Sequence, residues 1–260
     1  MRQPAMCPAC KENDIEVFGY GTERIEEEIT DKFPDAKIDR MDHDTTRNKN
    51  AYQDIITDFS TQQTDILVGT QMVTKGLDFE KVKVVGVLNA DTLLNFPDFR
   101  SNERGFSMLE QVAGRAGRRK EKGLVLIQTT DTDNKVLEYV KHHDYLAYYN
   151  AEIEQREELN YPPFSKLIMV YIKNKDIMIA EAAATLLAGA LREVFGERVL
   201  GPDKPFISRV ATYYLQQIML KIEIGASLAK VKTILRNIYE SLARDPKIKS
   251  SVLYYDVDPV

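Results

Sequence analysis

Two arginines near the middle of the chain have the residue type and the spacing to bind phosphate. Arg115 and Arg118 lie three residues apart in the segment QVAGRAGR (residues 111–118), and a glycine precedes each of them. A guanidinium is always charged and offers a rigid fork of donors that matches phosphate oxygens. Such a pair could stabilise the charge that develops on a transferring phosphoryl group, with Gln111 positioning a water or a phosphate. By spacing alone, a helix end followed by a basic, solvated loop explains these residues equally well.

The segment QVAGRAGR resembles motif VI of superfamily 2 helicases, and other segments match this superfamily in the same order. Residues 68–71 (VGTQ) followed by residues 75–79 (KGLDF) resemble motif V, just after a run typical of a buried strand. Residues 21–23 (GTE) resemble the turn that opens the first helix of the second motor lobe. Several motifs in the correct order are a stronger indication than any one of them alone.

A closer resemblance covers essentially the whole chain. The sequence is similar to the bacterial primosomal helicases that restart stalled replication, with the additional segments CPAC (7–10), GYGTE (19–23), NAD (89–91), PDFR (97–100) and DVDP (256–259). The long segment DILVGTQMVTKGLDF (65–79) is quite specific. The resemblance implies part of an ATP-dependent DNA helicase that recognises stalled or branched replication forks and restarts replication by primosome assembly.

The resemblance implies roles for residues of the ATP site. Arg115 and Arg118 would contact the β- and γ-phosphates of ATP, with Arg118 as the arginine finger, and Gln111 would be the third catalytic residue. Gly76 and Asp78 would belong to the nucleotide site, where Asp78 would face the ribose or a neighbouring arginine. A turn residue after Gly76 is the alternative explanation of Asp78.

The family also implies DNA contacts in the motor lobe. Gly69, Thr70 and Gln71 would couple the nucleotide site to a DNA phosphate. Gly21 and Thr22 would touch the tracking strand through a helix N-terminus, which is a natural phosphate site. A plain N-cap explains Thr22 equally well.

The chain contains no GxxxxGK[ST] segment and no acidic motif of the DEAH kind. In this architecture ATP and Mg²⁺ lie between two lobes, and the first lobe supplies the phosphate cradle, its lysine and the Mg²⁺ ligand. We therefore expect a C-terminal fragment that holds the arginines of an ATP site and lacks the rest of it.

The two cysteines, Cys7 and Cys10, have the CxxC spacing of zinc ligands but supply only half of a four-ligand site. The resembling family carries several CxxC pairs ahead of its second lobe, and this pair looks like the last of them. We expect no tightly bound Zn²⁺ in this chain. A redox CxxC is the alternative, which the lack of a following thioredoxin-like helix disfavours.

Elements that must position these residues follow from the hydrophobic pattern. Up to residue 150 apolar runs alternate with helical patterns, which predicts an α/β lobe with a parallel sheet: helices at 22–32, 49–60 and 102–113, and strands at 36–41, 65–69, 82–89 and 123–129. After a helical stretch to residue 159, the order becomes strand, helix, two strands, helix, strand, which is that of a ferredoxin-like α+β domain. We predict a remnant of the CxxC insertion (1–14), a second RecA-like lobe (15–152) and a smaller C-terminal α+β domain that binds DNA or a partner (153–260).

The C-terminal part is mildly basic, since residues 161–260 hold 14 Lys+Arg against 10 Asp+Glu in a chain of net charge −5. Arg209 and Tyr213 combine a cation and an aromatic ring, as single-strand binders do. A hairpin with ordinary surface lysines is the alternative, and the residues alone favour it. The family implies contacts with branched and single-stranded DNA, the tail of the single-strand-binding protein and primosome proteins.

Two other interpretations stay open. The chain could be the second lobe of another superfamily 2 remodelling ATPase, RecG- or UvrB-like, although the CPAC pair and the ferredoxin-like tail argue against it. It could also be a non-enzymatic nucleic-acid-binding adaptor. No apolar run is long enough to span a bilayer and no signal peptide is visible, so we expect a cytoplasmic protein without membrane contact.

The missing half of the ATP site gives the first testable prediction. This 260-residue polypeptide, assayed with ATP, Mg²⁺ and single-stranded DNA, should release no phosphate above background and should not unwind a duplex. Robust ATP turnover by the purified chain would contradict the expectation that the phosphate cradle lies elsewhere.

Overall fold

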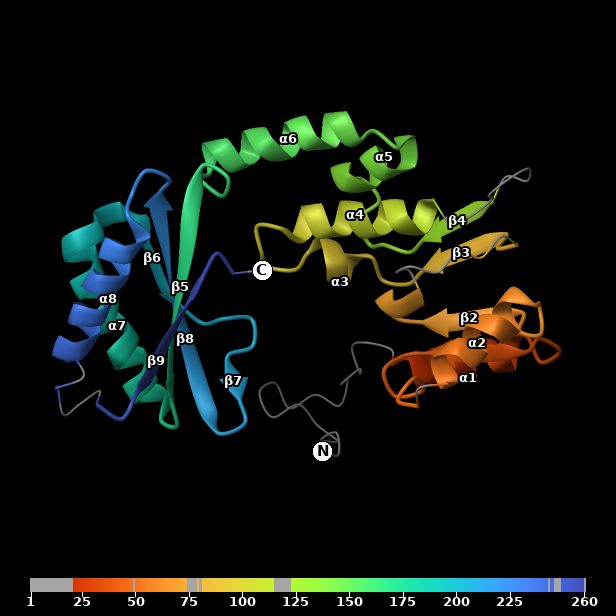
Figure 1. The fold of residues 1–260 in the computed structure, drawn as a ribbon, viewed down its shortest axis with the longest axis horizontal. Helices are drawn as coiled ribbons and strands as arrows, with labels where there is room; N and C mark the ends of the chain where they lie inside the picture. Colours follow the sequence, from red (N-terminus) through yellow and green to blue (C-terminus); the bar gives the residue numbers. More distant parts are fainter. Residues whose placement is uncertain are drawn as a thin grey trace. The chain divides into compact units, whose positions relative to one another are not determined.

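The computed structural model describes residues 21–48, 50–73, 79, 81–114, 123–242, 244, 245 and 249–259 (Figure 1). Contacts divide the chain into two compact units. The first comprises Met1–Thr92 and Arg104–Asp133, and the second comprises Leu93–Glu103 and Asn134–Val260. The chain therefore passes between the units three times, because residues 93–103 interrupt the first unit.

Helices and strands alternate along residues 21–133, as the sequence predicts. They are α1 (Thr22–Lys32), β1 (Ile38–Met41), α2 (Ala51–Ser60), β2 (Ile66–Gly69), the 3-10 helix η1 (Gln71–Val73), β3 (Val84–Val87), α3 (Asp91–Leu94), α4 (Ser101–Ala113) and β4 (Leu124–Ile127). Strand β1 pairs with β2 in parallel, and β3 pairs with β4 in parallel. The parallel pairing predicted from the alternation is therefore confirmed, as two separate strand pairs among the described residues.

The spacing of apolar residues decides which side of α4 is buried. Phe106, Leu109 and Val112 follow one another at intervals of three, so they share one side of the helix. All three are buried, and Leu109 is fully so. Gln111 lies on the exposed side of the last turn as a consequence.

The second unit contains an antiparallel sheet. Its elements are α5 (Lys135–His142), α6 (Tyr145–Glu158), β5 (Ser165–Asn174), α7 (Ile177–Phe195), the 3-10 helix η2 (Gly196–Arg198), β6 (Val199–Asp203), β7 (Arg209–Val210), β8 (Tyr213–Glu223), α8 (Leu228–Leu242) and β9 (Val252–Val257). The strand order is β6-β8-β5-β9, and the short β7 pairs with β8. Every pairing in this sheet is antiparallel.

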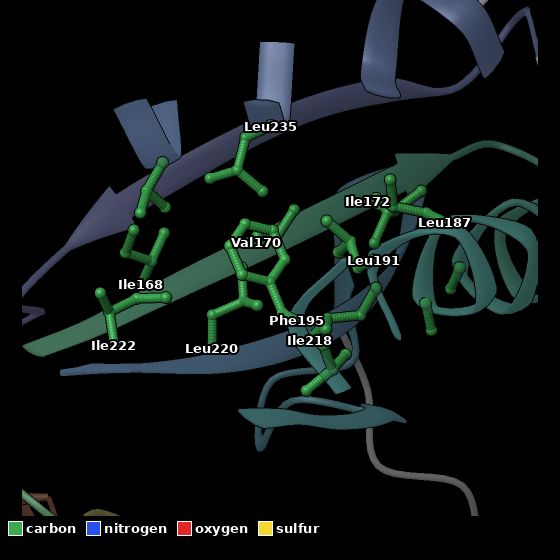
Figure 2. Packing of buried hydrophobic residues seen from close by; sticks show 14 of the residues in the cluster. Ile168, Val170, Ile172, Leu187, Leu191, Phe195, Ile218, Leu220, Ile222 and Leu235 are labelled. Atoms are coloured by element: carbon green, nitrogen blue, oxygen red, sulfur yellow. The ribbon is translucent and has the colours of Figure 1, made fainter. Parts of the chain in front are cut away.

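Helices α7 and α8 cover one face of this sheet and form the core with it (Figure 2). Alternate residues of β5, namely Ile168, Val170 and Ile172, point into the core because successive side chains of a strand face opposite sides. Leu220 and Ile218 stand directly opposite the first two of these residues on β8. These alternate apolar residues therefore decide which face of the sheet the two helices cover.

One strand was not predicted from the sequence. The predicted order has two strands between its helices, whereas the structure has three: β6, the two-residue β7 and β8, and both β6 and β7 pair with β8. Strand β6 contains Gly201 and Pro202, which are typical of turns and hide a strand from pattern analysis. Proline lacks the N–H of a ladder and is tolerated in edge strands or at a register shift; β6 is the edge of the order and shifts register between Leu200 and Asp203.

Residues 93–103 join the second unit through contacts with the residues around β5. The Phe99 ring stacks on the Tyr161 ring, with centroids 5.1 Å apart and planes 4° from parallel. Arg156 pairs with Glu103 and with Glu152, both at 2.8 Å. The Nζ of Lys221 lies 3.7 Å from the Tyr161 ring centroid. These stacked and paired groups explain why residues 93–103 belong to this unit.

The longest helix of the described residues is α7, with 19 residues. It packs on the sheet through alanine and leucine side chains. Neither α7 nor any other helix in the described parts of the chain is long and apolar enough to cross a bilayer.

Candidate nucleic-acid and nucleotide interface

The start of α1 is attached to the end of β1 by Thr22. Gly21 is the N-cap of α1, and Thr22 is its first helical residue. The Thr22 hydroxyl donates a hydrogen bond to Oδ2 of Asp42 at 2.5 Å. Thr22 is therefore not the N-cap of α1, and the plain N-cap explanation of this residue is wrong. Because the N-cap residue Gly21 has no side chain, no N-cap side chain binds the backbone N–H groups of the first turn.

Asp42 follows β1 directly and organises a tight turn. Its Oδ1 accepts hydrogen bonds from the backbone N–H groups of Asp44 and Thr45, both at 2.9 Å. The Nε of Arg40 lies 3.2 Å from Oδ2 of Asp42. The Thr22 hydroxyl, helped by these donors, lowers the pKa of Asp42 to about 2, so the carboxylate is ionised at neutral pH. Sequence reasoning missed Asp42, although the run of Asp and Thr after a strand is a turn signal.

Gly69 ends β2 at the position opposite Met41. A Cβ at Gly69 would lie 2.6 Å from the Met41 carbonyl oxygen and 2.9 Å from Cγ2 of Val73. Only glycine allows this close approach of two backbones. The next residues, Thr70 and Gln71, are exposed, and Gln71 begins η1.

These features gather at one edge of the β1–β2 pair. Parallel strands end on the same side, so Asp42 and Gly69 lie at neighbouring strand ends, where ligands of α/β folds commonly bind. Helix α1 packs against both strands. The edge presents the N-terminus of α1 beside the exposed hydroxyl and amide of Thr70 and Gln71, and these groups could donate hydrogen bonds to a phosphate.

The structure separates the two residues proposed for the C-terminal DNA site. Tyr213 and Tyr214 are consecutive on β8, so their side chains face opposite sides of the sheet. The Arg209 guanidinium lies 4.9 Å from the ring centroid of Tyr214, its partner across the β7–β8 ladder. Tyr213 instead lies near the ammonium groups of Lys173 and Lys175. Arg209 and Tyr213 therefore do not form one pair.

Comparison with known proteins identifies both parts of the chain. Residues 6–120 match the helicase conserved C-terminal domain, and residues 157–260 match the primosomal protein N C-terminal domain. The chain is 39% identical over 258 residues to the replication restart protein PriA of Bacillus subtilis, 40% over 258 residues to that of Synechocystis and 33% over 254 residues to that of Borreliella burgdorferi. These alignments cover 98%, 98% and 97% of this chain. The chain belongs to the PriA family.

The chain spans about a third of the length of these PriA relatives, since the three alignments cover 32%, 30% and 37% of them. The family is of the helicase type, which agrees with the resemblance that the motifs indicated. The combination of both family models along one chain favours PriA over the RecG- or UvrB-like alternative.

Several predicted site residues of the PriA-like sequence lie outside the described residues. These are Cys7, Cys10, Gly76, Asp78, Arg115 and Arg118. Among the predicted nucleotide-site and catalytic residues, the structure places Gln111, which is exposed on the last turn of α4. In the described parts of the chain, no group of three or more His, Cys, Asp or Glu side chains could hold a metal ion.

A second polar turn lies at the end of the β3–β4 pair. Asp91 follows β3 and accepts hydrogen bonds from the Thr129 hydroxyl at 2.6 Å and from the Thr130 backbone N–H at 2.8 Å. The Thr129 hydroxyl and the Thr130 donors lower the pKa of Asp91. Asp91 thus links the segments that follow β3 and β4 by hydrogen bonds, as Asp42 links the start of α1 to the end of β1.

Replacing Asp42 tests its role in this edge. Asp42→Asn should lower the free energy of unfolding at pH 7 by about 1–3 kcal/mol, because the carboxylate accepts charge-assisted hydrogen bonds. The pKa of Asp42 in the folded protein lies below the ordinary aspartate value of 3.8, so this stabilisation is complete above pH 3.8 and is lost as pH falls towards 2. Urea unfolding from pH 7 to pH 3 should show the difference between the two proteins shrinking. The exposed Asp44, replaced by Asn, is the control; an equal loss there would contradict the role given to Asp42.

Replacing Gly69 tests the close backbone approach. Gly69→Ala should destabilise the first unit by about 1–3 kcal/mol, because the new methyl group would overlap the Met41 carbonyl oxygen. Gly86→Ala in β3 is the matched control, since nothing lies within 4 Å of a Cβ there. Thermal unfolding should separate the two variants, and similar midpoints would show that the strands do not approach as closely as described.

Proposed function

We propose that this chain supplies the second motor lobe and the DNA-binding C-terminal domain of an ATP-dependent replication-restart helicase of the PriA type. In that enzyme it would recognise stalled or branched forks and take part in primosome assembly. The observation that carries the proposal is the edge of the β1–β2 pair, where the N-terminus of α1, Asp42 and residues 69–71 lie together after two parallel strands.

The proposed DNA contacts of the motor lobe are Gly21, Thr22, Gly69, Thr70 and Gln71. An uncapped first turn of α1 offers backbone N–H groups to a phosphate of the tracking strand. Thr70 and Gln71 are exposed beside it and would reach a neighbouring phosphate. The hydrogen bond between Thr22 and Asp42 fixes the start of the helix, so Thr22 would act mainly as a positioning residue.

The ATP site would be shared with a lobe that this chain does not contain. Arg115, Arg118 and Gln111 would face the phosphates and the attacking water, and Gly76 and Asp78 would contact the nucleotide. ATP and Mg²⁺ would be the cofactors of the whole enzyme. Cys7 and Cys10 would contribute half of a Zn²⁺ site whose other ligands lie elsewhere in the parent protein.

For residues 153–260 we propose a ferredoxin-like domain that binds DNA. The strand order β6-β8-β5-β9, with α7 and α8 packed on one face, supports this fold. Arg209 and Tyr213 are the proposed DNA contacts, on opposite faces of the sheet. Branched and single-stranded DNA, the single-strand-binding protein and primosome proteins are the proposed partners, and the proposed location is the cytoplasm.

By itself the chain could act as a nucleic-acid-binding adaptor without turnover, because it lacks a phosphate cradle. The exposed polar groups at the β1–β2 edge and the basic C-terminal part support DNA binding by the isolated polypeptide. Binding without ATP hydrolysis would be the expected behaviour of the chain as it stands.

The DNA edge of the motor lobe can be tested with the full 260-residue chain and a fluorescently labelled model fork. The double variant Thr70→Ala/Gln71→Ala should weaken fork binding roughly three- to tenfold, because two side chains that donate hydrogen bonds to phosphate oxygens are lost. Gln53→Ala, exposed on α2, is the matched control and should bind normally. Unchanged affinity of the double variant would show that the side chains of residues 70 and 71 do not contact the DNA.

A further inference from the structure

The helix-free face of the C-terminal sheet carries tyrosine and lysine side chains. Ile172 of β5 points into the core under α7 and α8, so its neighbours Tyr171 and Lys173 point to the opposite face. Tyr254 of β9 stands directly opposite Tyr171 and therefore shares this face. Tyr213 of β8 lies two residues before the partner of Lys173 in the ladder, which places it on the same face.

These side chains are in contact and form one row across three strands. The rings of Tyr171 and Tyr254 stack with centroids 5.0 Å apart and planes 21° from parallel. The Nζ of Lys173 lies 5.8 Å from the Tyr254 ring centroid and 5.4 Å from that of Tyr213. The Nζ of Lys175 lies 5.8 Å from the Tyr213 ring centroid. We call Tyr171, Lys173, Lys175, Tyr213 and Tyr254 the tyrosine–lysine row.

The row is accessible and has no part in the helix-covered core. Tyr254 is 42% exposed, Lys175 is exposed, and Tyr171, Lys173 and Tyr213 are half-buried. The hydrophobic core lies on the other face, where Ile168, Val170 and Ile172 meet the helices. Burial raises the pKa of Tyr254, so its phenol stays neutral at pH 7.

Charge is arranged unevenly along the row. Lys173 and Lys175 lie at its Tyr213 end. At the other end, burial, the neighbouring Tyr254 and the carboxylates of Asp256 and Asp98 raise the pKa of Tyr171. Lys173 and Lys175 would attract an anionic backbone, and the carboxylates near Tyr171 would repel it. A bound polyanion would therefore lie along the two lysines.

Single-stranded nucleic acid fits these properties better than a duplex does. Its unstacked bases can lie on aromatic rings while lysines meet the phosphates, and this binding tolerates any sequence because every base has a π-face. In a duplex the bases are stacked on one another and cannot cover Tyr254. An acidic peptide would use the lysines, but it has no need of neutral ring faces beside them.

We infer that the tyrosine–lysine row is a stacking platform for single-stranded nucleic acid, on which bases stack against Tyr254 and Tyr213 while Lys173 and Lys175 contact the backbone. This inference rests on the proposed DNA-binding function and adds the kind of strand and the residues that hold it. Of the five residues, the sequence pattern alone had pointed to Tyr213.

The absence of tryptophan from the whole sequence permits a direct test of stacking. Tyr254→Trp places a single tryptophan in the row, and Tyr149→Trp places one on α6, where Tyr149 is 47% exposed. In the full chain, titration with single-stranded oligothymidylate should quench the fluorescence of Tyr254→Trp strongly and leave that of Tyr149→Trp nearly unchanged. A blunt duplex of the same length should quench neither. Equal responses of the two tryptophans, or quenching by the duplex alone, would overturn the platform.

Affinity measurements complete the test. Tyr254→Ala should weaken oligothymidylate binding roughly tenfold, because one stacked base is lost, whereas Tyr254→Phe keeps the ring and should bind nearly as the unchanged chain does. Lys173→Gln should reduce the salt dependence by about one released ion. Tyr149→Ala is the control for affinity, and thermal unfolding checks that each variant is folded.

The outcomes separate the platform from the proposed function. If the unchanged chain binds fork DNA but Tyr254→Ala binds oligothymidylate normally, the platform is wrong and the proposed function stands. If the unchanged chain binds neither fork DNA nor oligothymidylate, both fail. If polyglutamate competes fully and Tyr254→Ala binds it less well, an acidic peptide is the occupant and the nucleic-acid platform is wrong.

Discussion

Backbone pairing between strands decides which functional side chains meet in each unit. In the first unit, the parallel register that sets Met41 opposite Gly69 also sets the Asp42 turn beside residues 70 and 71. In the second unit, the register of β5 with β8 and β9 places Tyr171 opposite Tyr254, while Ile168, Val170 and Ile172 face the helices. A shift of either register by one residue would turn the buried side chains of that strand to the exposed face and would separate the residues that meet there.

The two units use this constraint differently. The β1–β2 edge depends on backbone groups, a glycine without a side chain and one ionised carboxylate, so it is built from small residues that allow close approach. The face of the β5 sheet depends on large side chains that project away from the core and touch one another. The first arrangement suits a phosphate held by N–H donors, and the second suits a flat base beside a cation.

Local patterns predicted much of the fold because helix spacing and strand composition are local properties. The bounds of α1 agree with the expected 22–32, and the parallel pairing followed from the alternation of helices and strands. Strand β6 was not predicted because it contains Gly201 and Pro202, which are rare in strands. A strand can hold them at the edge of a sheet, and the edge position of β6 follows from the strand order, which the sequence does not show. Arg209 and Tyr213 were grouped because they are near in sequence, whereas alternation sends their side chains to opposite faces. Tyr171 and Tyr254 are far apart along the chain, and nothing local in either strand indicates that they stack.

Residues 93–103 connect two parts of the chain in an unusual way, because their contacts with Tyr161 and Arg156 place them in the second unit while the sequence on either side belongs to the first. A gene segment that encoded residues 134–260 alone would leave Tyr161 without its stacked ring and Arg156 without Glu103. Exchange of the C-terminal unit between related genes by a single recombination point would therefore break these contacts. The second unit is therefore complete only when residues 93–103 are present, and a change at Phe99 removes the ring that stacks on Tyr161.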